Sequence, residues 1–121
     1  MAKFECTIPA VYDFDDTLKY FHDHLSKCGV TASYEGGSDY RCGDFRVAVR
    51  VYERYTVLGD NRLSLTVTLA SAGEEIFASA IAAAGGGGMV KIWDWGEKEF
   101  LQCFQAAAEM FEGMKPRTGT L

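Results

Sequence analysis

Histidine is scarce in this chain, and the two that occur lie on the same predicted helix. His22 and His24 are two positions apart, so their side chains diverge by about 200° and cannot share one metal ion. General acid–base catalysis near neutral pH therefore has few candidate groups. No serine–histidine–acid or cysteine–histidine set can be assembled from the spacing. We expect a protein that is not an enzyme and that carries no cofactor.

A net positive charge and long apolar runs are also missing. The net charge is −5 at pH 7, whereas binding to nucleic acid or to an anionic membrane surface needs a positive field. No apolar run approaches the ~20 residues that cross a bilayer, and no apolar signal segment follows Met1. We therefore expect neither nucleic acid nor a membrane as a partner.

The four cysteines are scattered and form no C-x-x-C pair, which argues against a zinc site. Cys28 and Cys103 fall in the apolar stripes of two predicted helices, where a thiol usually packs as a small hydrophobe. Cys6 and Cys42 lie elsewhere in the chain. We expect reduced thiols, no bound metal and a cytoplasmic protein.

The longest regular pattern lies between residues 40 and 70. Residues 45–55 alternate between apolar and polar, and the alternation resumes over residues 63–69 after the turn signal Gly59-Asp60-Asn61. This pattern predicts a long antiparallel hairpin with Tyr55 opposite Leu63 and Val51 opposite Val67. In that register one apolar face carries Phe45, Val47, Val49, Leu63, Leu65 and Val67, with Glu53 among them.

The remaining segments predict two helices and several shorter strands. Asp13 is a typical N-cap residue type, and an amphipathic helix follows it as far as Gly29. A second helix runs from Asp94 to about Glu112, because Asp94 and Glu97 resemble a capping box. We expect further strands over residues 3–8, 30–35, 76–84 and 89–93, and a turn over 36–39. For the alanine-rich run 76–84 a helix is the alternative.

The expected fold class is therefore α+β, with the element order β-α-β-β-β-β-(β)-α. A mostly antiparallel sheet of five to six strands packs on two helices in a two-layer sandwich. We expect the helices to cover the face that carries Val47, Val49 and Leu65. Residues 1–112 are expected to form a single domain, and residues 113–121 a flexible C-terminal tail.

Arginine is concentrated in the central hairpin, which contains no lysine. In the expected register the arginines share one face with Tyr52 and with the hydroxyls of the next strand. Guanidinium groups and hydroxyls on a rigid sheet suit a carboxylate or a phosphate. We hypothesise an anion-binding site made of Arg46, Arg50, Tyr52, Arg54, Arg62 and Thr66. The alternative is a solvated sheet face with cross-strand charge pairs.

The segment Asp13-Phe14-Asp15-Asp16-Thr17-Leu18 resembles the first motif of the haloacid-dehalogenase-like phosphatases. The resemblance implies a Mg²⁺-dependent phosphatase in which Asp13 accepts the phosphoryl group and Asp15 is the general acid. That family has a parallel sheet, whereas the pattern here predicts hairpins. Its phosphate-binding lysine also lacks a counterpart, because no lysine occurs between Lys27 and Lys91. An N-cap at the start of a helix explains the same acidic residues.

The stretches Phe45–Tyr55 and Gly59–Leu65, preceded by Asp13-Phe14-Asp15-Asp16, resemble a small bacterial family of unknown function. The resemblance implies no activity and no site residues. The layout of sheet and helices is also similar to helix-grip and TATA-binding-protein-like folds, which host binding more often than catalysis. We therefore expect a non-enzymatic binding or interaction module whose partner is a small anionic or apolar ligand, another protein, or a second copy of itself in a homodimer.

Overall fold

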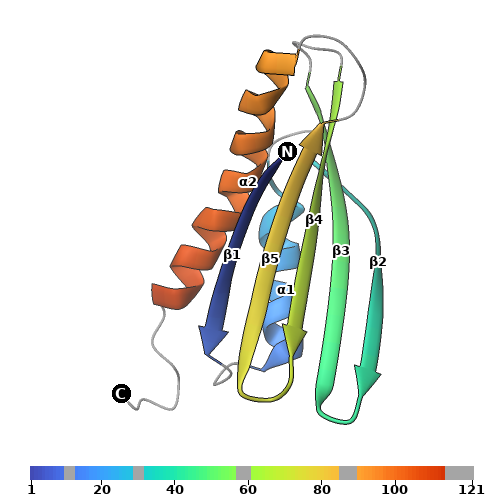
Figure 1. The fold of residues 1–121 in the computed structure, drawn as a ribbon, viewed down its shortest axis with the longest axis vertical. Coiled ribbons are helices and arrows are strands. Elements are labelled where there is room, and N and C mark those ends of the chain that lie inside the picture. Colours follow the sequence, from blue (N-terminus) through green and yellow to red (C-terminus); the bar gives the residue numbers. More distant parts are fainter. Residues whose placement is uncertain (10–12, 29–31, 57–60, 85–89, 114–121) are drawn as a thin grey trace.

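The structure, a computed structural model, describes residues 1–9, 13–28, 32–56, 61–84 and 90–113. It contains one antiparallel sheet and two helices (Figure 1). The elements in chain order are β1 (Ala2–Pro9), α1 (Phe14–Leu25), β2 (Ser33–Cys42), β3 (Phe45–Thr56), β4 (Asn61–Ser71), β5 (Glu75–Ala84) and α2 (Val90–Gly113). The predicted α+β class and the order β-α-β-β-β-β-α are confirmed.

The sheet is a four-stranded meander completed by the first strand of the chain. The spatial order is β1-β5-β4-β3-β2, and every neighbouring pair is antiparallel. Both helices lie on one side of the sheet, as the view in Figure 1 shows. We call this side the helix-covered face and the other side the open face. With only two helices, the described chain can cover one face of its sheet.

Helix α1 begins as the sequence predicts. The carboxylate of Asp13 accepts hydrogen bonds from the backbone N–H groups of Asp15 and Asp16 at 3.1 and 3.2 Å, which makes Asp13 the N-cap. These bonds satisfy two donors that have no partner inside the helix. The helix ends at Leu25, earlier than predicted. Its apolar stripe buries Phe21 and Leu25.

Helix α2 is longer than predicted. It begins at Val90, so the strand expected over residues 89–93 and the helix start at Asp94 are both wrong. A short apolar run does not by itself distinguish a strand from a helix segment, and the structure places residues 90–93 in the helix. Glu97 is consequently an interior residue of the helix. Its buried carboxylate accepts a hydrogen bond from the backbone N–H of Ala84, at 2.8 Å.

Strand β2 is longer than predicted, and the turn between β2 and β3 lies elsewhere in the chain. The turn expected over residues 36–39 is part of a continuous strand, and the chain turns at Gly43 instead, with a φ of +59°. A glycine inside a strand often marks a close approach by another group. Here a Cβ on Gly37 would lie 2.8 Å from Cδ of Arg50, so the glycine leaves room for that arginine.

Some predicted features lie outside the described residues. These are the turn at Gly59–Asp60 and residues 114–121 of the expected tail, whereas Gly113 closes α2. The strand predicted over residues 76–84 is confirmed as β5, against its helical alternative. Among the described segments, neither helix has the length and apolar character needed to cross a bilayer.

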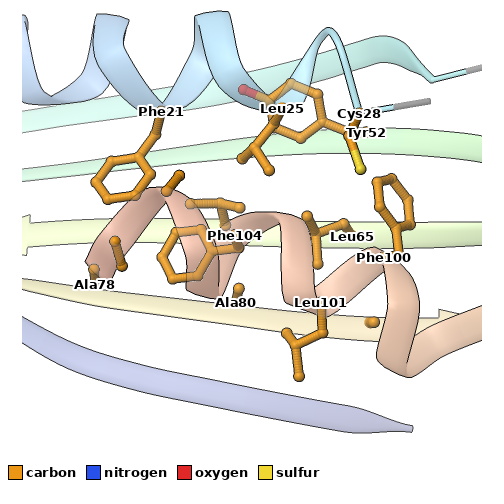
Figure 2. Close-up of a cluster of buried hydrophobic side chains, with 14 of the residues drawn as sticks. Phe21, Leu25, Cys28, Tyr52, Leu65, Ala78, Ala80, Phe100, Leu101 and Phe104 are labelled. Carbon is orange, nitrogen blue, oxygen red and sulfur yellow. The ribbon is translucent and has the colours of Figure 1, made fainter. Parts of the chain in front are cut away.

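The core lies between the helices and the helix-covered face (Figure 2). Phe104 is fully buried and stacks on Phe21 with 4.9 Å between the ring centroids. On β5 the residues that face α2 are the small Ala78, Ala80 and Ala82, all fully buried. Because these side chains are short, the bulky rings of α2 can pack close to the sheet.

We predict that Phe104→Ala lowers the free energy of unfolding by about 3 to 5 kcal/mol, because it leaves a cavity between the two helices and the sheet. Urea denaturation followed by circular dichroism measures the change. Met110→Ala is the matched control on the same helix, since Met110 is 62% exposed, and it should change the stability by about 0.5 kcal/mol or less. Equal effects of the two substitutions would contradict this description of the core.

Candidate functional site

The register between β3 and β4 decides which side chains face the helices. Arg54 lies opposite Leu63, and Tyr52 lies opposite Leu65. The predicted pairing, with Tyr55 opposite Leu63, is therefore wrong by one residue. A slip of one residue moves every side chain of a strand to the other face of the sheet. The arginines of β3 thus share a face with the leucines of β4.

The odd-numbered residues of β3 lie on the open face, contrary to the prediction. Val47, Val49 and Val51 are opposite Ala70, Thr68 and Thr66, none of which faces a helix. Phe45 is also on this face and is 42% exposed. Glu53, which we expected on the apolar face under the helices, is on the open face too. Its carboxylate accepts a hydrogen bond from Arg62 at 2.9 Å.

On the helix-covered face the arginines of β3 pack under the helices and pair with acids at the rim. The Arg46 guanidinium lies 4.3 Å from the centre of the Phe14 ring and forms a salt bridge with Asp15 at 2.8 Å. Arg50 pairs with Asp39 at 3.0 Å. An arginine stem covers apolar surface while its charged end reaches solvent. The arginines of β3 can therefore lie on the helix-covered face, although the sequence pattern assigned them to the polar face.

The six residues of the predicted anion site do not form one surface. Arg46, Arg50, Tyr52 and Arg54 lie on the helix-covered face, whereas Arg62 and Thr66 lie on the open face. Each of the four arginines has a carboxylate partner, which for Arg54 is Glu99. An anion would have to displace these carboxylates. Ligand binding by the six residues stays a prediction.

Tyr52 is the centre of a small polar and aromatic cluster under α1. Its side chain is 1% exposed, and its hydroxyl lies 3.0 Å from Nδ1 of His22. The Tyr34 ring contacts His22 edge-on, with 5.0 Å between the centroids. Burial raises the pKa of Tyr52 to about 12, because the phenolate would lose its hydration.

We predict that the raised pKa of Tyr52 makes the free energy of unfolding fall as the pH rises from about 10 to 12. In that window the unfolded chain loses the Tyr52 proton at its ordinary pKa of 10.0, whereas the folded chain retains it. The unfolded state therefore binds fewer protons, and the free energy of unfolding falls by about 2 kcal/mol as the pH rises. Tyr52→Phe should remove this part of the decrease in urea titrations. Tyr40→Phe, at a position that is 60% exposed, should leave it in place.

The acidic residues at the start of α1 have structural partners. Asp13 caps the helix, and Asp15 pairs with Arg46. The sheet beside them is antiparallel, so the resemblance to haloacid dehalogenases does not extend to that family's parallel layout. Within the described ranges, no three His, Cys, Asp or Glu side chains lie close enough together to hold a metal ion.

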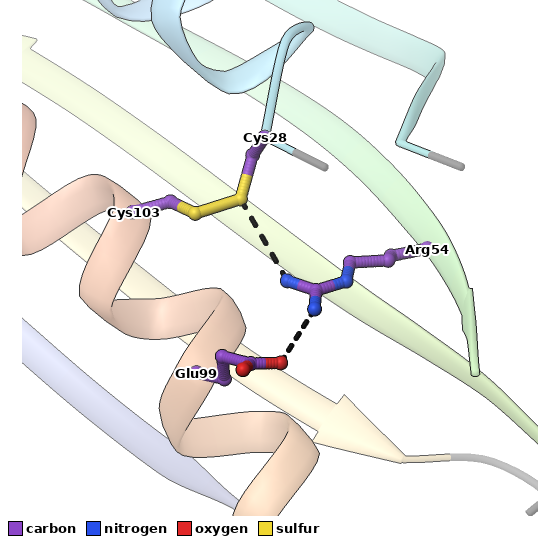
Figure 3. The surroundings of a disulfide bond; sticks show 4 residues. All are labelled: Cys28, Arg54, Glu99 and Cys103. Carbon is purple, nitrogen blue, oxygen red and sulfur yellow. Dashed lines mark hydrogen bonds and ion pairs between the residues drawn. A yellow bond between two sulfur atoms is a disulfide. The ribbon is translucent and has the colours of Figure 1, made fainter. Parts of the chain in front are cut away.

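Two cysteines form a disulfide, which corrects the prediction of reduced thiols. Cys28, just after α1, is bonded to Cys103 of α2, 75 residues further along the chain (Figure 3). Cys103 lies on α2 as expected, whereas Cys28 lies after the end of α1 and belongs to the core. The apolar setting of both cysteines was the sequence signal for the pairing, because residues that pack in one core can come together.

The open face carries most of the large apolar side chains that remain exposed. Its strands present aromatic and aliphatic groups to solvent, because no described helix covers this face. The exposed members are Tyr40 at 60%, Tyr55 at 43%, Phe77 at 43%, Phe45 at 42% and Ile81 at 36%. The sequence prediction missed this surface because it placed β3 the other way round.

The comparison with protein families finds a match over most of the chain. A family model described as "Family of unknown function (DUF6054)" matches residues 1–112. The chain belongs to the DUF6054 family. Membership confirms the expected family of unknown function and transfers no activity to the chain. No curated protein and no solved structure matches, so nothing supports the expected likeness of this DUF6054 chain to helix-grip or TATA-binding-protein-like folds.

Proposed function

We propose that this protein is a non-enzymatic interaction module that pairs with a second copy of itself through the open face of the sheet. The observation that carries the proposal is the group of exposed apolar side chains on a face that no described helix covers. Large contiguous apolar surfaces on soluble proteins usually mark interaction sites. An antiparallel sheet can face water on one side, but its exposed residues are then mainly polar.

The size of the open face matches what a stable dimer requires. Its five strands contain 8 to 12 residues each. At a rise of about 3.3 Å per residue and a strand spacing of about 4.8 Å, the face covers roughly 800 Å². A specific interface of standard size buries about 800 Å² on each partner. The whole face is therefore large enough to serve as one subunit's share of such an interface.

The charges on the open face do not oppose self-association. The chain as a whole has a net charge of −5, but the ladder residues of this face carry two basic and three acidic side chains. Lys3 pairs with Glu5, and Arg62 pairs with Glu53. Glu75 lies at the end of β5, away from the centre of the sheet. Two copies can therefore approach through this face with little repulsion.

The arrangement of large and small side chains supports a two-fold pairing. The central strand β4 presents small residues such as Thr68, whereas β3 presents valines and β5 presents Phe77 and Ile81. A two-fold axis along β4 places β3 of one copy over β5 of the other. Val47 then meets Phe77 of the second copy, and Val51 meets Ile81, since each pair shares a ladder row.

Edge-to-edge pairing through β2 is another route to a dimer, and it is less favourable. The ladder between β2 and β3 is interrupted between Tyr34 and Gly36, and Glu35, Asp39 and Arg41 line the strand. Bulges and charges are features that discourage pairing at a sheet edge.

We predict that the protein is a dimer at micromolar concentration and that Phe77→Glu makes it a monomer, because two carboxylates would be buried in the interface. Analytical ultracentrifugation measures the mass. Met110→Glu is the control: it introduces the same charge at an exposed apolar position of α2, which lies on the other side of the sheet. The proposal fails if the parent protein is monomeric, or if Phe77→Glu remains dimeric.

We further predict that Thr68→Cys is cross-linked to its own copy by a short bismaleimide, because Thr68 lies in the middle of the central strand. Facing sheets are about 10 Å apart, which is too far for a direct disulfide. The parent protein is the control. Its exposed Cys42 is on the edge strand β2, and the two-fold axis places the two copies of Cys42 at opposite edges. Equal cross-linking of the parent and the variant would contradict this geometry.

The other expectations from the sequence rank below this proposal. Anion binding by the arginines needs guanidinium groups that now pair with carboxylates. A phosphatase with Asp13 as nucleophile needs a carboxylate that now caps α1. The cytoplasm as the compartment also stays a prediction, and the Cys28–Cys103 disulfide argues against it, because cytosolic thiols are usually kept reduced.

A further inference from the structure

The two sulfur atoms of the disulfide lie in different surroundings. Cys28 is 5% exposed and belongs to the core. Cys103 is only partly buried and lies on α2, which forms the outer layer on the helix-covered face. Cys103 is the more exposed residue of the pair and is therefore the expected point of attack for a thiol from solvent.

A fixed positive charge lies beside the less accessible sulfur. Nη1 of Arg54 is 3.9 Å from Sγ of Cys28, while Nη2 of the same guanidinium donates a hydrogen bond to the carboxylate of Glu99 (Figure 3). Arg54 is also held by the ring of Phe100, whose centre is 5.8 Å away. A cation next to a sulfur atom stabilises the thiolate form and so improves that sulfur as a leaving group.

We infer that the Cys28–Cys103 disulfide is an exchange site for small thiols, in which Cys103 accepts the incoming sulfur and Cys28 departs as a thiolate beside Arg54. The ligand class is a low-molecular-weight monothiol in its thiolate form. The product is a mixed disulfide on Cys103, which is a covalent modification of α2.

The exchange balances without another reactant. The thiolate sulfur attacks Sγ of Cys103, a new S–S bond forms between them, and the Cys28–Cys103 bond breaks. The electron pair of the broken bond remains on Cys28 as the thiolate that Arg54 stabilises. A second thiolate can attack the mixed disulfide, which releases the oxidised small thiol and leaves both cysteines reduced.

This site is independent of the proposed dimer. Cys28, Cys103 and Arg54 lie on the helix-covered face, whereas the second copy would occupy the open face. Exchange opens the covalent link between α1 and α2 but leaves the strand ladders in place. Failure of one proposal therefore does not imply failure of the other.

The test is the rate at which reduced glutathione reacts with the folded, oxidised protein. Acid quenching, alkylation and peptide mass spectrometry identify which cysteine carries glutathione. We expect the mixed disulfide on Cys103 and a newly alkylated thiol on Cys28. Arg54→Met should slow the reaction roughly fivefold, because the departing thiolate loses its counter-charge, and Arg54→Lys should restore most of the rate.

Arg46→Met is the matched control. Arg46 is on the same strand and face and also pairs with an acid, but that acid is Asp15, on α1. This variant should react at the parent rate. Loss of stability cannot imitate the expected result, because a partly unfolded variant exposes its disulfide and reacts faster. The inference is overturned if the Arg54→Met and Arg46→Met variants react at equal rates, if glutathione is found on Cys28, or if the purified oxidised protein lacks the Cys28–Cys103 bond.

Discussion

The alignment of β3 with β4 is the constraint on which the other surfaces of this molecule depend. When Tyr52 is opposite Leu65, the arginines of β3 lie under the helices and the valines lie on the outside. A sheet has only two faces and the side-chain period is two, so no intermediate arrangement exists. The salt bridges of the β3 arginines and the position of the β3 valines on the open face follow from this one alignment.

The arginines act as part of the core boundary. Their aliphatic stems lie against aromatic rings, as Arg46 does on Phe14, and their guanidinium groups reach acids on neighbouring elements. Asp15 belongs to α1, Asp39 to β2 and Glu99 to α2. The three pairs therefore connect β3 to both helices and to its neighbouring edge strand, β2. Salt bridges at such partly exposed positions position the elements more than they stabilise them.

The sequence predicts the fold class and the helix cap but not which side chains of the central hairpin share a face. Apolar stripes identify both helices, and Asp13 is a recognisable N-cap because its side chain satisfies backbone donors locally. The register of the hairpin was not predictable in the same way, because β3 alternates valine with arginine and either set can cover apolar surface. Gly36-Gly37 indicated a turn, although one of these glycines makes room for Arg50. The disulfide joins residues 75 positions apart. The sequence pattern placed both cysteines among apolar residues but did not show that these two segments meet.

The small side chains of β5 have an effect beyond the packing of phenyl rings. Ala78, Ala80 and Ala82 set the interlayer distance between the sheet and α2. Cys103 is next to Phe104 on that helix, so the depth at which α2 sits on the sheet also contributes to the height of its sulfur above the strands. Three methyl groups on one strand thus help to place one end of a covalent link between distant parts of the chain.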